Sequence, residues 1–103
     1  MGVLRHVTII VGVNGIQVVP DPIHVSKKDT GQVCWHCPQG EAEITFADSP
    51  FYSDKFVAPR SGSVCSGPVV NRKECGDYKY SIIVRIPGDK RDYQVDPTVI
   101  VDD

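Results

Sequence analysis

Four cysteines carry the most distinctive chemistry in this chain of 103 residues. Two of them form a Cys34-x-x-Cys37 motif with His36 between them, and Cys65 and Cys75 follow further along. Because thiolate and imidazole groups are good zinc and copper ligands, one interpretation is a metal site built on the first three residues with Cys65 or Cys75 as the fourth. No second Cys-x-x-Cys completes a zinc-ribbon pattern. We therefore favour a structural role for the cysteines and keep the metal site as the alternative.

The segment from Gln32 to Cys37 is expected to be a strand. Extended backbone turns successive side chains to opposite faces, which places Val33 and Trp35 on one face and Cys34 and His36 on the other. A thioredoxin-type redox motif needs its first cysteine at a helix N-terminus, which lowers the thiol pKa. The strand setting therefore argues against that third interpretation.

The pairing of the cysteines follows from the expected strand order. The strand that holds Cys34 and Cys37 should lie antiparallel to a strand that begins around Cys65. This arrangement favours two nested disulfides, Cys37–Cys65 and Cys34–Cys75. A local Cys34–Cys37 bridge is disfavoured, because extended backbone holds the two Cα atoms roughly 10 Å apart. If the thiols stay reduced, the same proximity would bring the sulfurs together as a metal cage.

The rest of the chain is typical of an all-β protein. Eight prolines and nine glycines punctuate it, at intervals of roughly ten residues, which is the spacing of short strands and turns in a sandwich. Asn14-Gly15 is a strong turn signal. Pro20 and Pro22 cannot donate to a β-ladder, so the strand that contains them should lie at an edge or bend there. The expected strands cover residues 7–13, 16–25, 32–37, 41–46, 62–70, 76–84 and 96–103.

Alternation along these strands also predicts the core, because every second side chain faces one side of a sheet. The segment Ser49 to Tyr52 reads as a packed loop, and His6 and His24 read as surface histidines. The predicted core side chains are Val33, Trp35, Ile44, Phe46, Tyr78, Tyr80, Ile82, Val99 and Val101.

Four short patterns occur in the order Pro22-x-x-Val25, Lys28-Asp29-Thr30, Val33-x-Trp35 and Gly76-x-Tyr78-x-Tyr80. In this order they resemble the cupredoxin fold of plastocyanin-like proteins, over a span from about residue 5 to the end of the chain. The resemblance implies a single cupredoxin-like domain over residues 1–103. It would be a Greek-key β-sandwich of about seven to eight strands.

The same resemblance implies where a blue copper ion would be bound. The first histidine of that family would fall at about Ala42 or Glu43, the cysteine at about Ile82 and the second histidine near Arg85. The only methionine is Met1. None of these positions offers the thiolate and imidazole donors that copper needs. The resemblance therefore implies the scaffold and argues against a blue copper centre, and we expect no cofactor.

An immunoglobulin-like sandwich is the second choice of fold. It shares a Gly-x-Tyr corner with this chain. It would need a cysteine where Tyr80 stands and a tryptophan well after its first cysteine, whereas Cys34 and Trp35 are adjacent. The cupredoxin-like sandwich is therefore preferred.

Composition and motifs exclude several classes of function. A formal net charge of -2 gives no field that would attract nucleic acid or an anionic membrane. No apolar stretch approaches the roughly 18 residues of a membrane span. No nucleophile elbow, phosphate loop or dinucleotide fingerprint occurs, so no catalytic residue is assigned. The acidic residues near the C-terminus do not have the spacing of a calcium loop.

We expect a non-catalytic binding or interaction module whose partner is another protein. The alternative is a protein that binds zinc or copper through Cys34, His36 and Cys37. The compartment stays open, since the chain is either cytosolic or, with Met1-Gly2 in place of a removed leader, secreted or periplasmic.

Overall fold

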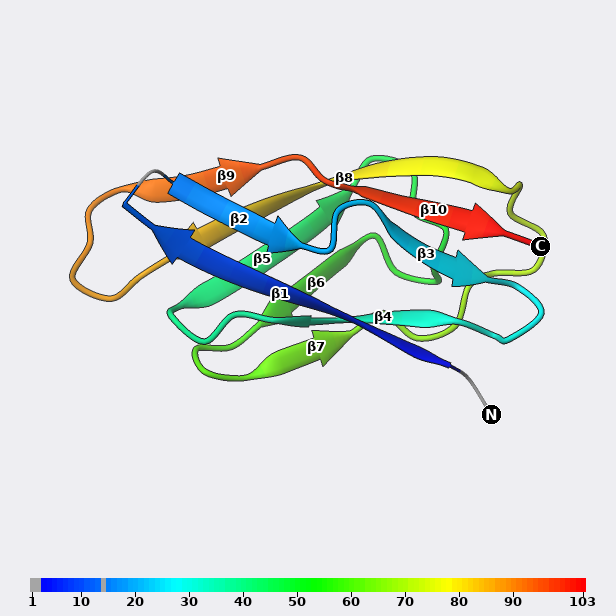
Figure 1. Ribbon diagram of the computed structural model, residues 1–103, viewed down its shortest axis with the longest axis horizontal. Coiled ribbons are helices and arrows are strands. Elements are labelled where there is room, and N and C mark those ends of the chain that lie inside the picture. Colours follow the sequence, from blue (N-terminus) through cyan, green and yellow to red (C-terminus); the bar gives the residue numbers. More distant parts are fainter. Residues whose placement is uncertain (1–2, 14) are drawn as a thin grey trace.

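The computed structural model describes residues 3–13 and 15–103 and folds them into two β-sheets without a helix (Figure 1). It therefore contains no helix that could cross a membrane within those residues. Asn14, half of the predicted Asn14-Gly15 turn, lies outside the described residues. The strands in the described part are β1 (Leu4–Gly12), β2 (Gly15–Val19), β3 (Ile23–Ser26), β4 (Gln32–His36), β5 (Glu41–Phe46), β6 (Lys55–Ala58), β7 (Ser63–Cys65), β8 (Gly76–Arg85), β9 (Asp92–Val95) and β10 (Thr98–Asp102).

The prediction of an all-β protein with two sheets is confirmed, and both sheets are mixed. The four-stranded sheet has the order β2-β1-β4-β7. The six-stranded sheet has the order β3-β10-β8-β5-β6, with β9 paired to β8. The pairs β1–β4 and β3–β10 are parallel, and the other pairs of strands are antiparallel. Ten strands form in the described part of the chain instead of the expected seven to eight, because the segment over residues 16–25 is divided and because β6 and β9 form where no strand was expected.

The predicted strand over residues 16–25 divides where its prolines lie. β2 belongs to the four-stranded sheet and β3 to the six-stranded sheet, and Pro20, Asp21 and Pro22 connect them. A proline has no N–H to give to a ladder, so the chain leaves one sheet here and joins the other. The Asp21 carboxylate accepts a hydrogen bond from the Thr98 N–H at 3.0 Å, which holds the crossing segment against β10.

Other boundaries shift for similar reasons. The expected strand over residues 62–70 shrinks to β7, because Gly67 has a φ of 76° and Pro68 follows it. Strand β9 was not predicted and lies between the expected strands over residues 76–84 and 96–103, where it pairs with β8. The predicted packed loop is confirmed in part, since Phe51 is buried but Tyr52 is 76% exposed.

The core between the sheets centres on Trp35, which is fully buried. Its indole lies 5.4 Å from the ring of Phe56, 5.7 Å from that of Tyr80, 6.3 Å from that of Phe46 and 6.5 Å from that of Phe51, measured between ring centroids. These residues come from both sheets and from the loop after β5. All the predicted core side chains are buried: Val33, Trp35, Ile44, Phe46, Tyr78, Tyr80, Ile82, Val99 and Val101.

Candidate functional site

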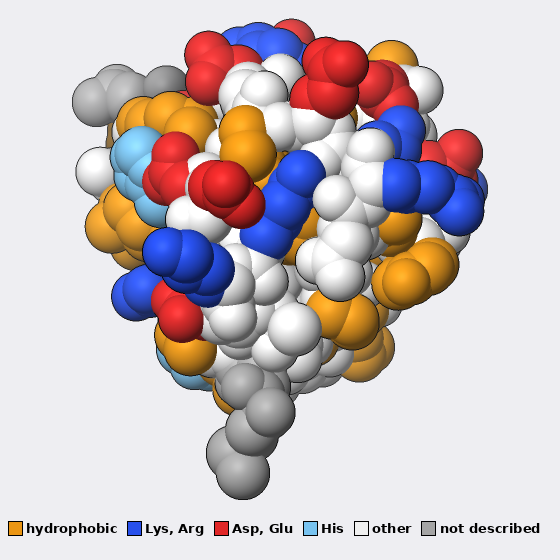
Figure 2. Space-filling model, turned by 90° about the vertical axis from the view of Figure 1, so that its right-hand side faces the viewer, with side chains coloured by type: hydrophobic (Ala, Val, Ile, Leu, Met, Phe, Trp, Pro, Cys, Tyr) orange, Lys and Arg blue, Asp and Glu red, His pale blue; other side chains and the backbone are white. Residues whose placement is uncertain are grey.

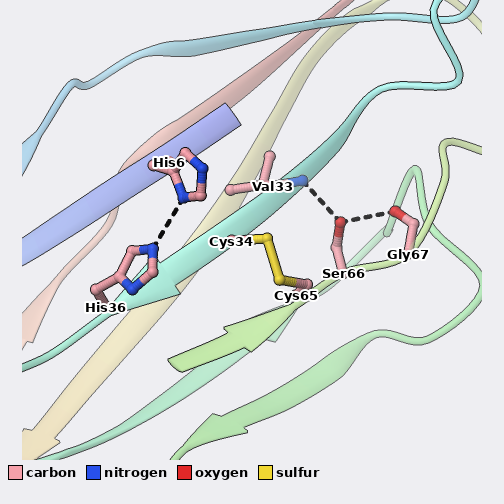
Figure 3. Close-up of a disulfide and its surroundings, with 7 residues drawn as sticks. All are labelled: His6, Val33, Cys34, His36, Cys65, Ser66 and Gly67. Carbon is pink, nitrogen blue, oxygen red and sulfur yellow. Dashed lines mark hydrogen bonds between the residues drawn. A yellow bond between two sulfur atoms is a disulfide. The ribbon is translucent and has the colours of Figure 1, made fainter. Parts of the chain in front are cut away.

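The outer face of the four-stranded sheet carries a disulfide between Cys34 and Cys65 (Figure 3). The two residues lie directly opposite each other in the antiparallel β4–β7 pair. The predicted antiparallel neighbours are confirmed, but the nested pairs Cys37–Cys65 and Cys34–Cys75 are wrong. Cys37 is three residues from Cys34, and an odd spacing turns a side chain to the opposite side of the sheet. Register, which the cysteine spacing does not reveal, decides the pairing.

The remaining two cysteines are free thiols in different environments. Cys37 is fully buried in the core, and this burial raises the pKa of its thiol, although hydrogen bonds from the Gly40 and Gln39 backbone oppose the shift. Cys75 is exposed in the turn before β8. Neither thiol therefore lies on the face that holds the disulfide.

The alternative metal cluster is not assembled as it was expected. Cys34 and Cys65 are bonded to each other, Cys37 is buried in the core and Cys75 lies in the turn before β8, so only His36 remains of the five proposed ligands. Across residues 3–13 and 15–103, no three His, Cys, Asp or Glu side chains are grouped so that they could hold a metal ion.

No spacing in the sequence indicates that His6 is a neighbour of His36. Nδ1 of His6 and Nε2 of His36 are 3.0 Å apart and share a hydrogen bond, in which one ring donates and the other accepts (Figure 3). The parallel pairing of β1 and β4 sets His6 opposite Cys34 and Thr8 opposite His36. The histidine pair and the disulfide therefore share one face. The expectation that His6 is a surface histidine did not identify the neighbouring strand.

This outer face is also free of charged residues among those that the structure describes. The residues on this face are identified from the strand register, because residues opposite each other in a ladder point to the same side of the sheet. Leu4, Ile10 and Val19 are 48%, 42% and 45% exposed on it. We call it the neutral face, and its non-glycine residues are Leu4, His6, Thr8, Ile10, Gln17, Val19, Gln32, Cys34, His36, Ser63 and Cys65.

The outer face of the six-stranded sheet is different, because charged side chains cross it. Glu43 lies 3.5 Å from both Lys55 and Arg85, and Glu41 lies 4.0 Å from Arg85. Such exposed ion pairs contribute at most about 1 kcal/mol each to stability, but they keep a face hydrated. At the end of the molecule where β3 and β10 finish, acidic and basic side chains are interspersed with apolar ones (Figure 2). The neutral face is thus a local feature and not the general character of the surface.

The positions that the cupredoxin resemblance assigns to copper ligands lie in the six-stranded sheet. Ala42 on β5 and Ile82 on β8 are fully buried, and both face the core from neighbouring strands of this sheet. Glu43 and Arg85 point outward and form the ion pair described above. These side chains fill the interior and the charged face, and none of them offers a soft donor.

Comparisons of the chain with known protein families, with curated proteins and with solved structures found no match. The class of this protein is therefore defined only by its fold and by the residues of its neutral face. It is a two-sheet β-protein whose neutral face carries the Cys34–Cys65 disulfide and a hydrogen-bonded pair, His6 and His36.

Proposed function

We propose that this chain is a non-catalytic β-sandwich module that binds another protein through its neutral face. The observation that carries the proposal is the charge asymmetry between the two sheets. Depletion of charged residues is what distinguishes the core of a protein interface from other surface. On the neutral face, Leu4, Ile10 and Val19 expose apolar area with no charged side chain between them.

The scaffold in this proposal is cupredoxin-like and lacks a blue copper site. Three of the segments that carry the resemblance lie in strands of both sheets: Pro22-x-x-Val25 leads into β3, Val33-x-Trp35 lies in β4 and Gly76-x-Tyr78-x-Tyr80 opens β8. The apolar residues Ala42 and Ile82 at the implied ligand positions support a scaffold used for something other than electron transfer.

The partner is a protein with a neutral, partly apolar surface. A charged partner surface would lose hydration on this face without gaining an ionic partner, which is unfavourable. The hydroxyl, amide and imidazole groups around the apolar side chains would supply the polar rim that interfaces usually have. Those groups come from Thr8, Gln17, Gln32, His36 and Ser63.

The test uses matched positions on the two faces. Ile10 and Val57 are 42% and 43% exposed, on the neutral face and on the six-stranded sheet respectively. A photo-crosslinking residue at position 10 should capture a discrete partner in the source cell, and the same residue at position 57 should not. The captured protein is then purified and titrated against the chain by calorimetry.

Substitution decides whether the captured protein binds at this face. Val19→Asp should weaken binding of the purified partner at least about tenfold, whereas Val57→Asp should leave it unchanged. Equal capture from positions 10 and 57, or binding unaffected by Val19→Asp, would overturn the proposal. Capture of a second copy of the chain, with a dimer in light scattering, would overturn the assignment to a different protein.

A further inference from the structure

Four metal-binding side chains share one small part of the neutral face. His6, Cys34 and Cys65 form a row across β1, β4 and β7, since each is opposite the next in its ladder. His36 follows Cys34 by two residues and therefore points to the same side. Neighbouring strands are about 4.8 Å apart, and residues two apart along a strand are separated by about 6.6 Å. All four side chains can therefore reach a common point above β4.

The two histidines are already close to the separation of two ligands in a zinc site. Their facing nitrogens are 3.0 Å apart and their ring centroids are 5.2 Å apart. Two imidazoles on a tetrahedral zinc ion, with bonds of about 2.0–2.1 Å, have nitrogens roughly 3.3 Å apart and centroids roughly 5.2 Å apart. The observed distances place the two nitrogens nearly in line with the two ring centroids, as in a hydrogen bond. Each ring must therefore turn by roughly 35°, and the donor ring must carry its proton on its other nitrogen, for both lone pairs to converge on a cation.

The sulfurs become ligands only when the disulfide is reduced. The Cys65 residue is exposed and Cys34 is 1% exposed, so a small dithiol reductant reaches the bond from the Cys65 side. One thiolate of the dithiol attacks a sulfur and forms a mixed disulfide, and its second thiolate then displaces the remaining protein thiolate. The reductant ends as a disulfide, the protein gains two electrons and two protons, and Cys34 and Cys65 become free thiols.

We propose that, after this reduction, His6, Cys34, His36 and Cys65 bind one zinc ion in a tetrahedral site. Two thiols lose their protons to solvent, and the resulting thiolates and two neutral imidazoles complete the four ligands that zinc prefers. The sulfurs must move to roughly 3.8 Å apart to accept bonds of about 2.3 Å, and side chains on neighbouring strands reach this separation by rotation about χ1.

The net charge of the occupied zinc site suits the neutral face. Two thiolates balance the charge of a divalent zinc ion, so the occupied site is neutral. The neutral face supplies no Asp, Glu, Lys or Arg among its described residues, and a neutral site needs no further counter-charge. In the oxidised form only two imidazoles remain as donors, so binding should be much weaker. The disulfide therefore acts as a switch for metal affinity.

The experiment measures zinc and cobalt binding to the full chain before and after reduction. The chain is reduced with a dithiol, which is removed without air, and zinc affinity is measured by competition with a chromophoric chelator. The reduced chain should bind one equivalent of zinc at least about 100-fold more tightly than the oxidised chain. Cobalt bound to it should show thiolate-to-metal charge transfer in the near ultraviolet.

Variants identify the ligands. His6→Ala and His36→Ala should each weaken zinc binding to the reduced chain at least about tenfold. His24→Ala, at an exposed histidine on β3, and Cys75→Ser, at an exposed free thiol, are matched controls and should leave it unchanged. Equal affinity in the two redox states, unaltered affinity in both ligand variants, or loss in Cys75→Ser would each overturn the proposal.

Unfolding of the reduced chain would not prevent the test. In that case zinc should restore the β-sheet circular dichroism of the reduced chain, because a metal that binds only the folded state stabilises it. Zinc should fail to restore it when His6→Ala and His36→Ala are combined, but should restore it with His24→Ala. Zinc that does not refold the reduced wild-type chain would overturn the site.

Discussion

The indole N–H of Trp35 donates a hydrogen bond to the hydroxyl oxygen of Tyr80 at 3.2 Å, and this buried bond joins the two sheets. Trp35 lies on β4 of the four-stranded sheet and Tyr80 on β8 of the six-stranded sheet. Burial raises the pKa of the Tyr80 hydroxyl, so this group stays neutral at all ordinary pH values. The bond gives an acceptor to the indole N–H, which is the one polar group of this fully buried side chain.

Removal of the Tyr80 hydroxyl should destabilise the fold. Tyr80→Phe leaves the Trp35 N–H buried without an acceptor, and an unpaired buried donor costs about 1–3 kcal/mol of unfolding free energy. Urea unfolding measures this difference. Tyr52→Phe is the control, because Tyr52 is 76% exposed and its loss of a hydroxyl should change stability by less than about 0.5 kcal/mol. Equal effects of the two substitutions would contradict the role given to the bond.

Removal of the indole should have a larger effect. Trp35 is fully buried among aromatic rings from both sheets, so Trp35→Ala should lower the free energy of unfolding by about 3–5 kcal/mol. The measurement is again the urea midpoint and slope. A loss below about 1 kcal/mol would show that the cavity collapses or that the side chain is exposed, and either result would contradict this core arrangement.

Alternation allowed the core to be predicted because it depends only on local sequence. Val33, Trp35 and Ile44 each lie two positions from another inward side chain, and a strand offers only two faces. The break in the segment over residues 16–25 could also be predicted from local sequence, since a proline lacks an N–H in any context. These properties require no knowledge of neighbouring strands.

The disulfide and the histidine pair could not be predicted because they depend on register. The sequence indicated that the strand with Cys34 lies beside the strand with Cys65, but a shift by one residue exchanges the faces of a strand. His6 and His36 are 30 residues apart and meet through a parallel pair, β1 and β4. No spacing within either strand encodes that pairing, so the sequence predicts only a surface histidine at position 6.

The two free thiols should differ sharply in reactivity. Cys75 is exposed, whereas Cys37 is fully buried and burial raises the pKa of its thiol, which leaves little reactive thiolate. Ellman's reagent should therefore modify one thiol per folded chain rapidly and the second only after denaturation. Cys75→Ser should abolish the fast reaction and Cys37→Ala should retain it. Rapid modification of two thiols in the native chain would contradict the burial of Cys37.

The Asp89 carboxylate lies in the connection between β8 and β9, and its hydrogen bonds predict how the stability of the fold depends on pH. The Arg91 backbone N–H donates to Oδ1 of Asp89 at 2.9 Å, and the Tyr93 hydroxyl donates to Oδ2 at 2.7 Å. These hydrogen bonds favour the charged form and hold the pKa of Asp89 at about 2. An unfolded aspartate has a pKa of about 3.9, so the folded state binds its proton less readily.

The sign of the pH effect follows from this lowered pKa. The stabilising contribution of Asp89 should be complete above the unfolded pKa and should disappear as the pH falls towards about 2. Carboxyl-detected NMR titration should give the low midpoint in the wild-type chain and a higher one in Tyr93→Phe, which removes one donor. The stability difference between the wild-type chain and Asp89→Asn should likewise be larger at neutral pH than in strong acid. An unchanged midpoint in Tyr93→Phe would show that Tyr93 does not donate to the carboxylate. A stability difference that does not vary with pH would show that the carboxylate is solvated and makes neither bond.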